Sequence, residues 1–498
     1  MTYEEKLQQY KDWIFRRSAY QMAMAIIGID KQTVAPSAGA AYRDERSAYL
    51  AGELFSIETD PEMIQLLKEL KDDPQIDGDN KRAVELYYKQ AMDTMCIPKE
   101  EFVAYQKLRD ESFDAWIKAK SQSDYSIFEP YLKKIIEVSK KLYRYRNSDK
   151  NLYDQMLDDY EPGMTQEKYD VFFTALKERL VPLIQKVTKA KQKNEAFLHQ
   201  EFPIEDQKKF MIQLLAYLHF DSSWGYQNES EHPFTSWTCE NDCRTTTKYV
   251  INDVVSAVLS TVHEVGHAYY EHNVDPKYDG MILSEGISSG MHESQSRLCE
   301  NYLARTTAFW KYHYPKLQEA FPTQLGNVSI EEFYEAINVA KPSFVRTEAD
   351  ELTYPLHILV RYEIEKGLFN GIISTEGLNE TWNKMYKEYL GVDVPNDKVG
   401  ILQDVHWSDG SFGYFPTYAL GTAFAAQYMH AMRKDLDVDA LLSNNQYDVI
   451  MNWLKEHIHK YGFRYEAPEL MKKVSGEEFN VNYYLDYLEE KYTKLYNL

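Results

Sequence analysis

The 498-residue sequence predicts a mainly α-helical protein with one small β element. The chain has only 21 glycines and 17 prolines, about 8% of its residues against a usual ~12%, and this scarcity favours long helices over turn-rich β structure. Apolar residues also recur at helical spacing along most of the chain, whereas strand-like sequence is confined to one stretch.

The first predicted helix covers residues 2–28, where Thr2 and Glu5 have the spacing of a capping box. The apolar run inside it, residues 19–29, follows acidic residues, unlike a signal peptide, and is too short to span a bilayer. Helical periodicity predicts further helices at 78–96, 99–120, 126–147, 165–195, 204–217, 297–318, 330–340, 355–369, 375–389, 417–433, 445–461 and 482–496.

Residues 237–251 form the strand-like stretch and predict a short β-ribbon beside the helix that follows. Asn252 or Asp253 is suited to the N-cap of that helix. Valine recurs on one face at positions 254, 258, 262 and 265, and no Lys or Arg occurs between Lys248 and Lys277. A helix this apolar is expected to be mostly buried.

The bulk properties limit the class of protein. No Pro-, Gly- or Ser-rich linker divides the chain, so we expect a single domain, residues 1–498. A net charge of −22 argues against nucleic acid as a partner, because that affinity depends on neutralising phosphates. Four cysteines are too few for a disulfide framework, and we expect reduced thiols. We found no targeting or membrane-spanning segment and expect a cytoplasmic location.

Within the buried helix, residues 263–267 read H-E-x-x-H. Residues four apart lie on one helical face, so His263 and His267 can bind a single metal ion. Glu264 lies beside the site and can accept a proton from water, as in hydrolytic zinc centres. Buried histidines and a buried glutamate need partners, and a metal supplies one.

A catalytic zinc usually has a third protein ligand. The metzincin pattern needs a glycine at position 270 and a histidine at position 273, and neither is present. Two glutamates then compete, Glu285 and Glu293. Glu293 is favoured because Ser288 or Ser289 could cap a helix that carries it, and a helix holds a ligand more rigidly than a glycine-containing segment does.

Six motifs, in order, give the chain a resemblance to a known family. They are His232-Pro233-Phe234, Asp242-Cys243-Arg244-Thr245-Thr246, the H-E-x-x-H at 263–267, His292-Glu293-Ser294-Gln295, Arg346-Thr347-Glu348-Ala349-Asp350-Glu351, and Gly400-Ile401-Leu402-Gln403-Asp404-Val405-His406-Trp407. With these motifs the chain resembles the carboxypeptidase Taq family of zinc metallocarboxypeptidases. The length of that family also fits the whole chain.

The resemblance implies a helical, saddle-like fold with a deep central groove, related to angiotensin-converting enzyme and the neurolysin-type oligopeptidases. It implies a homodimer with one divalent metal ion per chain. Zinc is expected, although cobalt or manganese suits the same ligands. The resemblance assigns the third ligand to Glu293, in agreement with the choice made from the residues.

The remaining roles follow the chemistry of peptide hydrolysis. Glu264 is expected to be the general base, and His406 and Tyr418 are candidates to donate hydrogen bonds to the oxyanion. Recognition of a free α-carboxylate favours a guanidinium; Arg346 is preferred for this role, and Arg244 is expected to be scaffold. Either arginine could instead form a structural ion pair, with Asp350 or Asp242 nearby in sequence.

Three functions remain open from sequence. The leading one is release of single C-terminal residues from peptides with a free C-terminus. A zinc oligopeptidase or dipeptidyl carboxypeptidase shares the metal chemistry. A peptide-binding scaffold with a structural metal is disfavoured, because such a site has no need of a base and normally closes with a fourth protein ligand.

Overall fold

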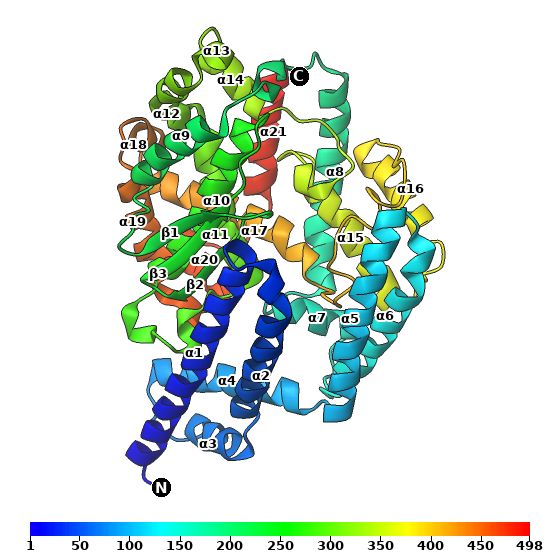
Figure 1. The fold of residues 1–498 in the computed structure, drawn as a ribbon, viewed down its shortest axis with the longest axis vertical. Coiled ribbons are helices and arrows are strands. Elements are labelled where there is room, and N and C mark those ends of the chain that lie inside the picture. Colours follow the sequence, from blue (N-terminus) through cyan, green and yellow to red (C-terminus); the bar gives the residue numbers. More distant parts are fainter.

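A computed structural model describes residues 1–498 and shows a mainly α-helical protein with one small sheet (Figure 1). The helices in the first half of the chain are α1 (Tyr3–Thr33), α2 (Ala40–Glu58), α3 (Pro61–Lys71), α4 (Gly78–Met95), α5 (Lys99–Gln122), α6 (Glu129–Arg144), α7 (Leu152–Tyr160), α8 (Gln166–Lys189) and α9 (Ile204–Tyr217). The helices in the second half are α10 (Val254–His272), α11 (Ser289–Arg297), α12 (Thr307–Ala320), α13 (Pro322–Leu325), α14 (Ile330–Ile337), α15 (Tyr354–Phe369), α16 (Leu378–Leu390), α17 (Phe415–Asp435), α18 (Val438–Ser443), α19 (Tyr447–His457), α20 (Ala467–Ser475) and α21 (Asn482–Tyr496).

Helix starts that sequence chemistry predicted are found in the structure. Thr2 and Glu5 form the capping box of α1. Of the two candidate caps for α10, Asp253 is the one used, because its carboxylate accepts from the N–H of Ser256. Ser288 caps α11 by accepting from the N–H of Met291. These side chains satisfy N–H groups that the first turn of a helix leaves without a partner.

One predicted helix was wrong. Residues 297–318 were expected to be continuous, but α11 ends at Arg297, a π-helix covers Leu298–Ala304, and α12 begins at Thr307. The hydroxyl of Thr306 accepts from the N–H of Phe309 and starts the new helix. Apolar spacing does not distinguish an α from a π turn, and that is why the pattern read as one helix. Helices α2, α3, α7, α13, α18 and α20 were not predicted. Helix α2 buries only Ile57, so its sequence needs no apolar stripe that a periodicity search could detect.

The sheet has three strands in the order β1-β3-β2. The predicted ribbon corresponds to β2 (Thr235–Cys239) and β3 (Asp242–Thr247), which pair antiparallel. The third strand, β1 (Gly225–Glu229), pairs parallel with β3 and was not predicted, because its sequence Gly-Tyr-Gln-Asn-Glu is short and polar. The sheet packs against α10, and α1 also contacts β2 (Figure 1).

The apolar side chains form two separate cores. The larger has 103 buried residues and includes α10, α11 and α17. The smaller has 15 buried residues, contributed mainly by α1, α3 and α4 and by the segment 274–283. The N-terminal helices therefore pack around a small core of their own, in the lower part of Figure 1.

The helices α10, α11 and α17 approach one another closely at glycines. A Cβ added at Gly266 of α10 would lie 2.9 Å from Cα of Ser296. A Cβ added at Gly421 of α17 would lie 2.6 Å from the carbonyl oxygen of Gly290 and 2.9 Å from Cβ of Glu293. Such contacts are too short for any larger residue, so these glycines set the spacing of the three helices. None of the helices combines the length and the apolar character that crossing a bilayer requires.

Candidate metal centre

Two helices bring together the three residues predicted to bind metal. His263 and His267 lie one turn apart on α10, and Glu293 lies on α11. Glu293 Oε2 is 3.7 Å from His263 Nε2 and 3.6 Å from His267 Nε2. Their possible ligand atoms all lie within 4.8 Å of one another. Two imidazole nitrogens and one carboxylate oxygen, all aimed at one point, fit a single divalent ion.

The other oxygen of Glu293 is held by an arginine of the same helix. Arg297 Nε donates to Glu293 Oε1 at 2.7 Å, which leaves Oε2 to face the histidines. Burial raises the pKa of Glu293, but Arg297 and His263 outweigh that effect and hold the pKa well below its usual range. Glu293 is therefore charged at neutral pH, as a ligand must be.

Further buried groups hold the outer nitrogens of the two histidines. Glu300, in the π-helix, has Oε2 at 2.9 Å from His263 Nδ1, and Arg297 also donates to this oxygen. His267 Nδ1 lies 2.6 Å from Nδ1 of another histidine, His292. Such outer hydrogen bonds fix the ring orientation and tautomer of a ligand.

Glu264, the predicted base, is 7% exposed and lies on the same helix as the two histidines. Thr235 of β2 donates its hydroxyl to Glu264 Oε2 at 2.5 Å. Burial raises the pKa of Glu264, while His263 and Thr235 oppose that rise. A carboxylate with a raised pKa is a better proton acceptor than an ordinary surface carboxylate.

These groups open onto a cleft with a cavity volume of about 720 Å³. The two histidines, Glu293 and Glu264 all line it, as does Tyr418 of α17. The site therefore has an accessible side at which a substrate and a water can approach the three ligands. A structural metal site would instead be closed by a fourth protein ligand.

The structure also brings His406 and Tyr418 together. Tyr418 Oη lies 3.5 Å from His406 Nε2, and His406 Nδ1 is buried without a hydrogen-bond partner. Burial lowers the pKa of His406 to about 4, so its ring is neutral at neutral pH. Burial raises the pKa of Tyr418 well above its usual value, so its hydroxyl keeps its proton.

Arg346, preferred for the substrate carboxylate, and Arg244, expected to be scaffold, both lie outside the residues that line the cleft. Arg346 is 7% exposed, and its Nε and one terminal nitrogen donate to Asp404 Oδ1 at 3.1 and 2.9 Å. Its ion-pair partner is thus Asp404 and not the Asp350 considered from sequence. Arg244 pairs with Asp242 at 2.7 Å, the partner considered from sequence.

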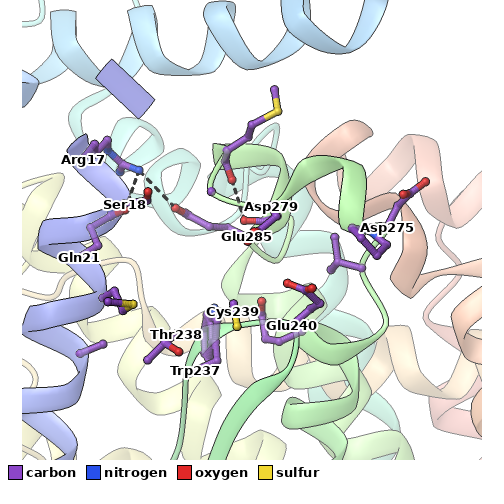
Figure 2. Close-up of a pocket in the computed structure, with 18 residues that line it drawn as sticks. Arg17, Ser18, Gln21, Trp237, Thr238, Cys239, Glu240, Asp275, Asp279 and Glu285 are labelled. Atoms are coloured by element: carbon purple, nitrogen blue, oxygen red, sulfur yellow. Dashed lines mark hydrogen bonds and ion pairs between the residues drawn. The ribbon is translucent and has the colours of Figure 1, made fainter. Parts of the chain in front are cut away.

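Glu285, the competing candidate for third ligand, also lines the cleft, but its carboxylate pairs with an arginine. Its Oε1 lies 3.9 Å from a guanidinium nitrogen of Arg17, and Figure 2 shows the two side chains directed toward each other from opposite walls of a second cavity. This second cavity has a volume of about 260 Å³ and lies between α1 and the end of β2. The choice of Glu293 over Glu285 agrees with this geometry.

Sequence reasoning missed several residues of the site, and each was missed for a physical reason. Thr235 is 29 residues from Glu264, and only the three-dimensional fold brings the two together. His292 precedes Glu293 on the same helical segment, and Glu300 follows it. A search for hydrogen-bonding side chains near the third ligand would have found both.

Two histidines of H-E-x-x-H and a distant glutamate, open to a cleft with a buried carboxylate beside them, define a metal-dependent hydrolase on a helical scaffold. Comparison with known proteins narrows this class. The model of the carboxypeptidase Taq (M32) metallopeptidase family matches residues 9–492, and the chain belongs to this family. It is therefore a metallocarboxypeptidase that needs a divalent metal ion.

Two relatives and two solved structures show how far the likeness extends. Carboxypeptidase 1 of Bacillus subtilis is 42% identical over 100% of this chain and 99% of its own length. Thermostable carboxypeptidase 1 of Thermus thermophilus is 35% identical over 97% of both chains. The crystal structure of an M32 carboxypeptidase from Deinococcus radiodurans superimposes with a TM-score of 0.96, at 31% identity over 99% of this chain and 100% of that one. Metallocarboxypeptidase 1 of Trypanosoma cruzi gives a TM-score of 0.92, at 30% identity over 98% and 99% of the chains.

Proposed function

We propose that this metallocarboxypeptidase releases single C-terminal amino acids from peptides, with zinc held by His263, His267 and Glu293 and with Glu264 as the general base. The observation that carries the proposal is the position of Glu264, which lies beside the three ligands on the wall of the same cleft. When bound, the metal supplies Lewis-acid activation of a water and of the scissile carbonyl.

Glu264 transfers a proton from the attacking water to the leaving amine. Its carboxylate, with the pKa raised by burial, takes a proton from the attacking water and later gives it to the leaving amine. The hydroxyl of Thr235 lies 2.5 Å from Oε2 of Glu264 and 2.9 Å from the backbone carbonyl oxygen of the same residue, and this contact orients the carboxylate.

Tyr418 and His406 stabilise the negative charge that develops on the carbonyl oxygen. Tyr418 lines the cleft and keeps its proton, so its hydroxyl can donate directly. His406 lies behind it and is neutral. A neutral imidazole that contacts the tyrosine oxygen orients the hydroxyl without adding charge to the site.

Arg346 is the proposed receiver of the substrate carboxylate. Three of its five N–H groups are used, two by Asp404 and one by the hydroxyl of Tyr354. Its guanidinium also lies 4.9 Å from the ring centroid of Tyr418, which lines the cleft. Two N–H groups therefore remain for a carboxylate that reaches past Tyr418.

Peptides blocked at the N-terminus test the proposal directly. A mixed pool with free C-termini is incubated with the zinc enzyme, and the products are measured by mass spectrometry. Successive loss of single residues is the expected result. Loss of two residues at a time or an internal cut would support a dipeptidyl carboxypeptidase or an oligopeptidase instead, and intact peptides would support a binding protein.

The proposal also covers the identity of the metal, the partners of the chain and its location in the cell. Zinc is favoured by two imidazoles and one carboxylate, and cobalt or manganese suits the same set. The second copy of this chain in a homodimer is the expected partner, and neither nucleic acid nor a membrane is expected. We also propose a cytoplasmic location.

A further inference from the structure

The two histidine ligands differ in the group that holds their outer nitrogen. His263 Nδ1 contacts the carboxylate of Glu300 directly, at 2.9 Å. His267 Nδ1 contacts another imidazole nitrogen, Nδ1 of His292, at 2.6 Å. Two ring nitrogens share a hydrogen bond only when one carries a proton and the other a lone pair, so the tautomers of His267 and His292 are linked.

The side chain of Glu271 determines the direction of this hydrogen bond. His292 Nε2 lies 2.7 Å from Glu271 Oε1, and the glutamate side chain is 2% exposed. A carboxylate only accepts, so Nε2 of His292 carries the proton of this hydrogen bond, and a His292 ring with one proton has its lone pair on Nδ1. His267 must then donate from Nδ1, which leaves the lone pair on His267 Nε2, the nitrogen that faces Glu293.

The reverse direction would prevent metal binding. A proton on His292 Nδ1 would force the proton of His267 onto Nε2, where a metal needs the lone pair. The chain from Glu271 through His292 therefore selects the one tautomer of His267 that can bind.

Packing holds His292 in this position. Its ring stacks on Trp237 of β2, with centroids 5.4 Å apart, and meets the edge of Tyr270 of α10 at 5.2 Å. Glu271 is one turn beyond His267 on α10 and also lines the second cavity, shown in Figure 2. The relay thus spans the wall between the cleft and this second cavity.

We propose that His292 and Glu271 are positioning residues that set the tautomer of His267 and thereby the affinity of the chain for its metal. The inference rests on the proposed metal centre. His292 directly precedes Glu293 in the sequence. One short segment therefore supplies the ligand Glu293 and also the side chain that orients the ligand His267.

Zinc affinity tests the relay without any measurement of activity. The dissociation constant of zinc is measured by competition with a chelator for the wild type, His292→Phe and His292→Gln. His292→Phe keeps a ring but loses both hydrogen bonds, and we expect affinity to fall about 10- to 100-fold, the usual loss when such an outer partner is removed. His292→Gln can accept from His267 and donate to Glu271, and it should stay within a few-fold of the wild type.

Two controls separate the relay from general damage to the fold. His459→Phe alters another buried histidine, whose ring bonds Gln295 and Asn273 and no metal ligand, and it should leave zinc affinity unchanged. His267→Ala removes a ligand and should abolish binding; if it does not, the proposed metal centre itself is wrong. Equal affinity in His292→Phe and the wild type would overturn the relay, as would an equal loss in His459→Phe.

Glu271→Gln provides a second variant in case apo His292→Phe does not fold, as judged by thermal melting. The amide fills the same space but no longer forces its partner to be a donor. A several-fold weaker affinity with an unchanged melting temperature of the apoprotein supports the relay. An unchanged affinity contradicts it.

Discussion

At the level of single residues, Glu264 is the side chain whose role can be separated from that of the metal. Glu264→Gln keeps the size of the side chain and its contact with Thr235 but cannot accept a proton. We expect at least a ~10²-fold loss of kcat, the low end for general acid–base catalysis. Zinc content, measured by atomic absorption, should match the wild type. Near-normal turnover in a metal-loaded variant would show that another group activates the water.

Arg346 is tested by the preference of the enzyme for a free C-terminus. A charged hydrogen bond to a carboxylate contributes about 1.5–3 kcal/mol, so kcat/KM for a free acid should exceed that for its C-terminal amide by roughly ten- to a hundredfold. Arg346→Lys keeps the charge beside Asp404 but loses the forked geometry, and it should shrink this ratio.

The matched control for that experiment is Arg244→Ala, because Arg244 pairs with Asp242 on the sheet and should leave the ratio unchanged. Thermal melting must accompany both variants, since breaking a buried pair such as Arg346–Asp404 costs about 3–5 kcal/mol. If folded Arg346→Lys keeps the full preference and Arg244→Ala loses it, the substrate carboxylate binds at Arg244.

At the level of helices, Gly421 tests whether the spacing of α11 and α17 sets the metal site. Gly421→Ala puts a Cβ 2.6 Å from the Gly290 carbonyl and 2.9 Å from Cβ of Glu293, so α11 must move. We expect a loss of about 1–3 kcal/mol in the free energy of unfolding, typical of overpacking, together with weaker zinc binding.

Gly28→Ala is the control for that substitution. A Cβ at Gly28 of α1 meets nothing within 4 Å, so alanine should stabilise the helix by about 0.5–1 kcal/mol and leave zinc binding unchanged. Denaturant unfolding and chelator competition measure both variants. Full zinc affinity in Gly421→Ala would mean that α11 is held in place by other contacts.

The buried His313 of α12 should make the free energy of unfolding decrease at acidic pH. It is 1% exposed, neither ring nitrogen has a hydrogen-bond partner, and burial lowers its pKa from 6.5 to about 3. Because the unfolded chain binds the proton more tightly, the stability that neutral His313 contributes is present above pH 6.5 and is lost as pH falls toward 3. At pH 5 the loss is about 2 kcal/mol, since each pKa unit corresponds to about 1.36 kcal/mol.

His313→Phe should remove this pH dependence. Phe309 and Tyr217 surround the ring at centroid distances of 4.3 Å, so a phenyl group suits the position. Urea unfolding of both proteins at pH 7.5 and pH 5 gives the comparison. Between pH 7.5 and pH 5 the free energy of unfolding should fall less in His313→Phe than in the wild type. An identical fall in both proteins would show that His313 is not buried as described.

The sequence predicted those parts of the site that depend on local spacing. H-E-x-x-H fixes the positions of His263 and His267 on one helical face, and the Ser288 cap indicates the helix that carries Glu293. Contacts between distant segments could not be predicted in this way. Arg346 lies 58 residues from Asp404, and Thr235 lies 29 from Glu264, so only tertiary packing pairs them.

The whole molecule has two cores of very different size, and this predicts unequal stability. Helices α1, α3 and α4 share a core of 15 buried residues, whereas α10 and α17 lie in one of 103. Local opening is easiest where few apolar side chains are buried. Amide hydrogen exchange, followed by mass spectrometry, should show opening of α3 and α4 at a lower free energy than α10 and α17. Uniform protection would mean that the two cores unfold together.

The π-helix at Leu298–Ala304 makes the number of residues in this part of the chain as important as their identity. A π turn holds more residues than an α turn, so the segment accommodates extra chain length without a loop. Glu300 lies inside this segment and holds Nδ1 of His263. Deleting one residue would return the segment toward α-helical pitch and turn Glu300 in another direction, so His263 would lose this partner although all three ligands were still encoded. Surface loops tolerate insertions and deletions, whereas a variant with one residue fewer in Leu298–Ala304 should bind zinc more weakly in chelator competition.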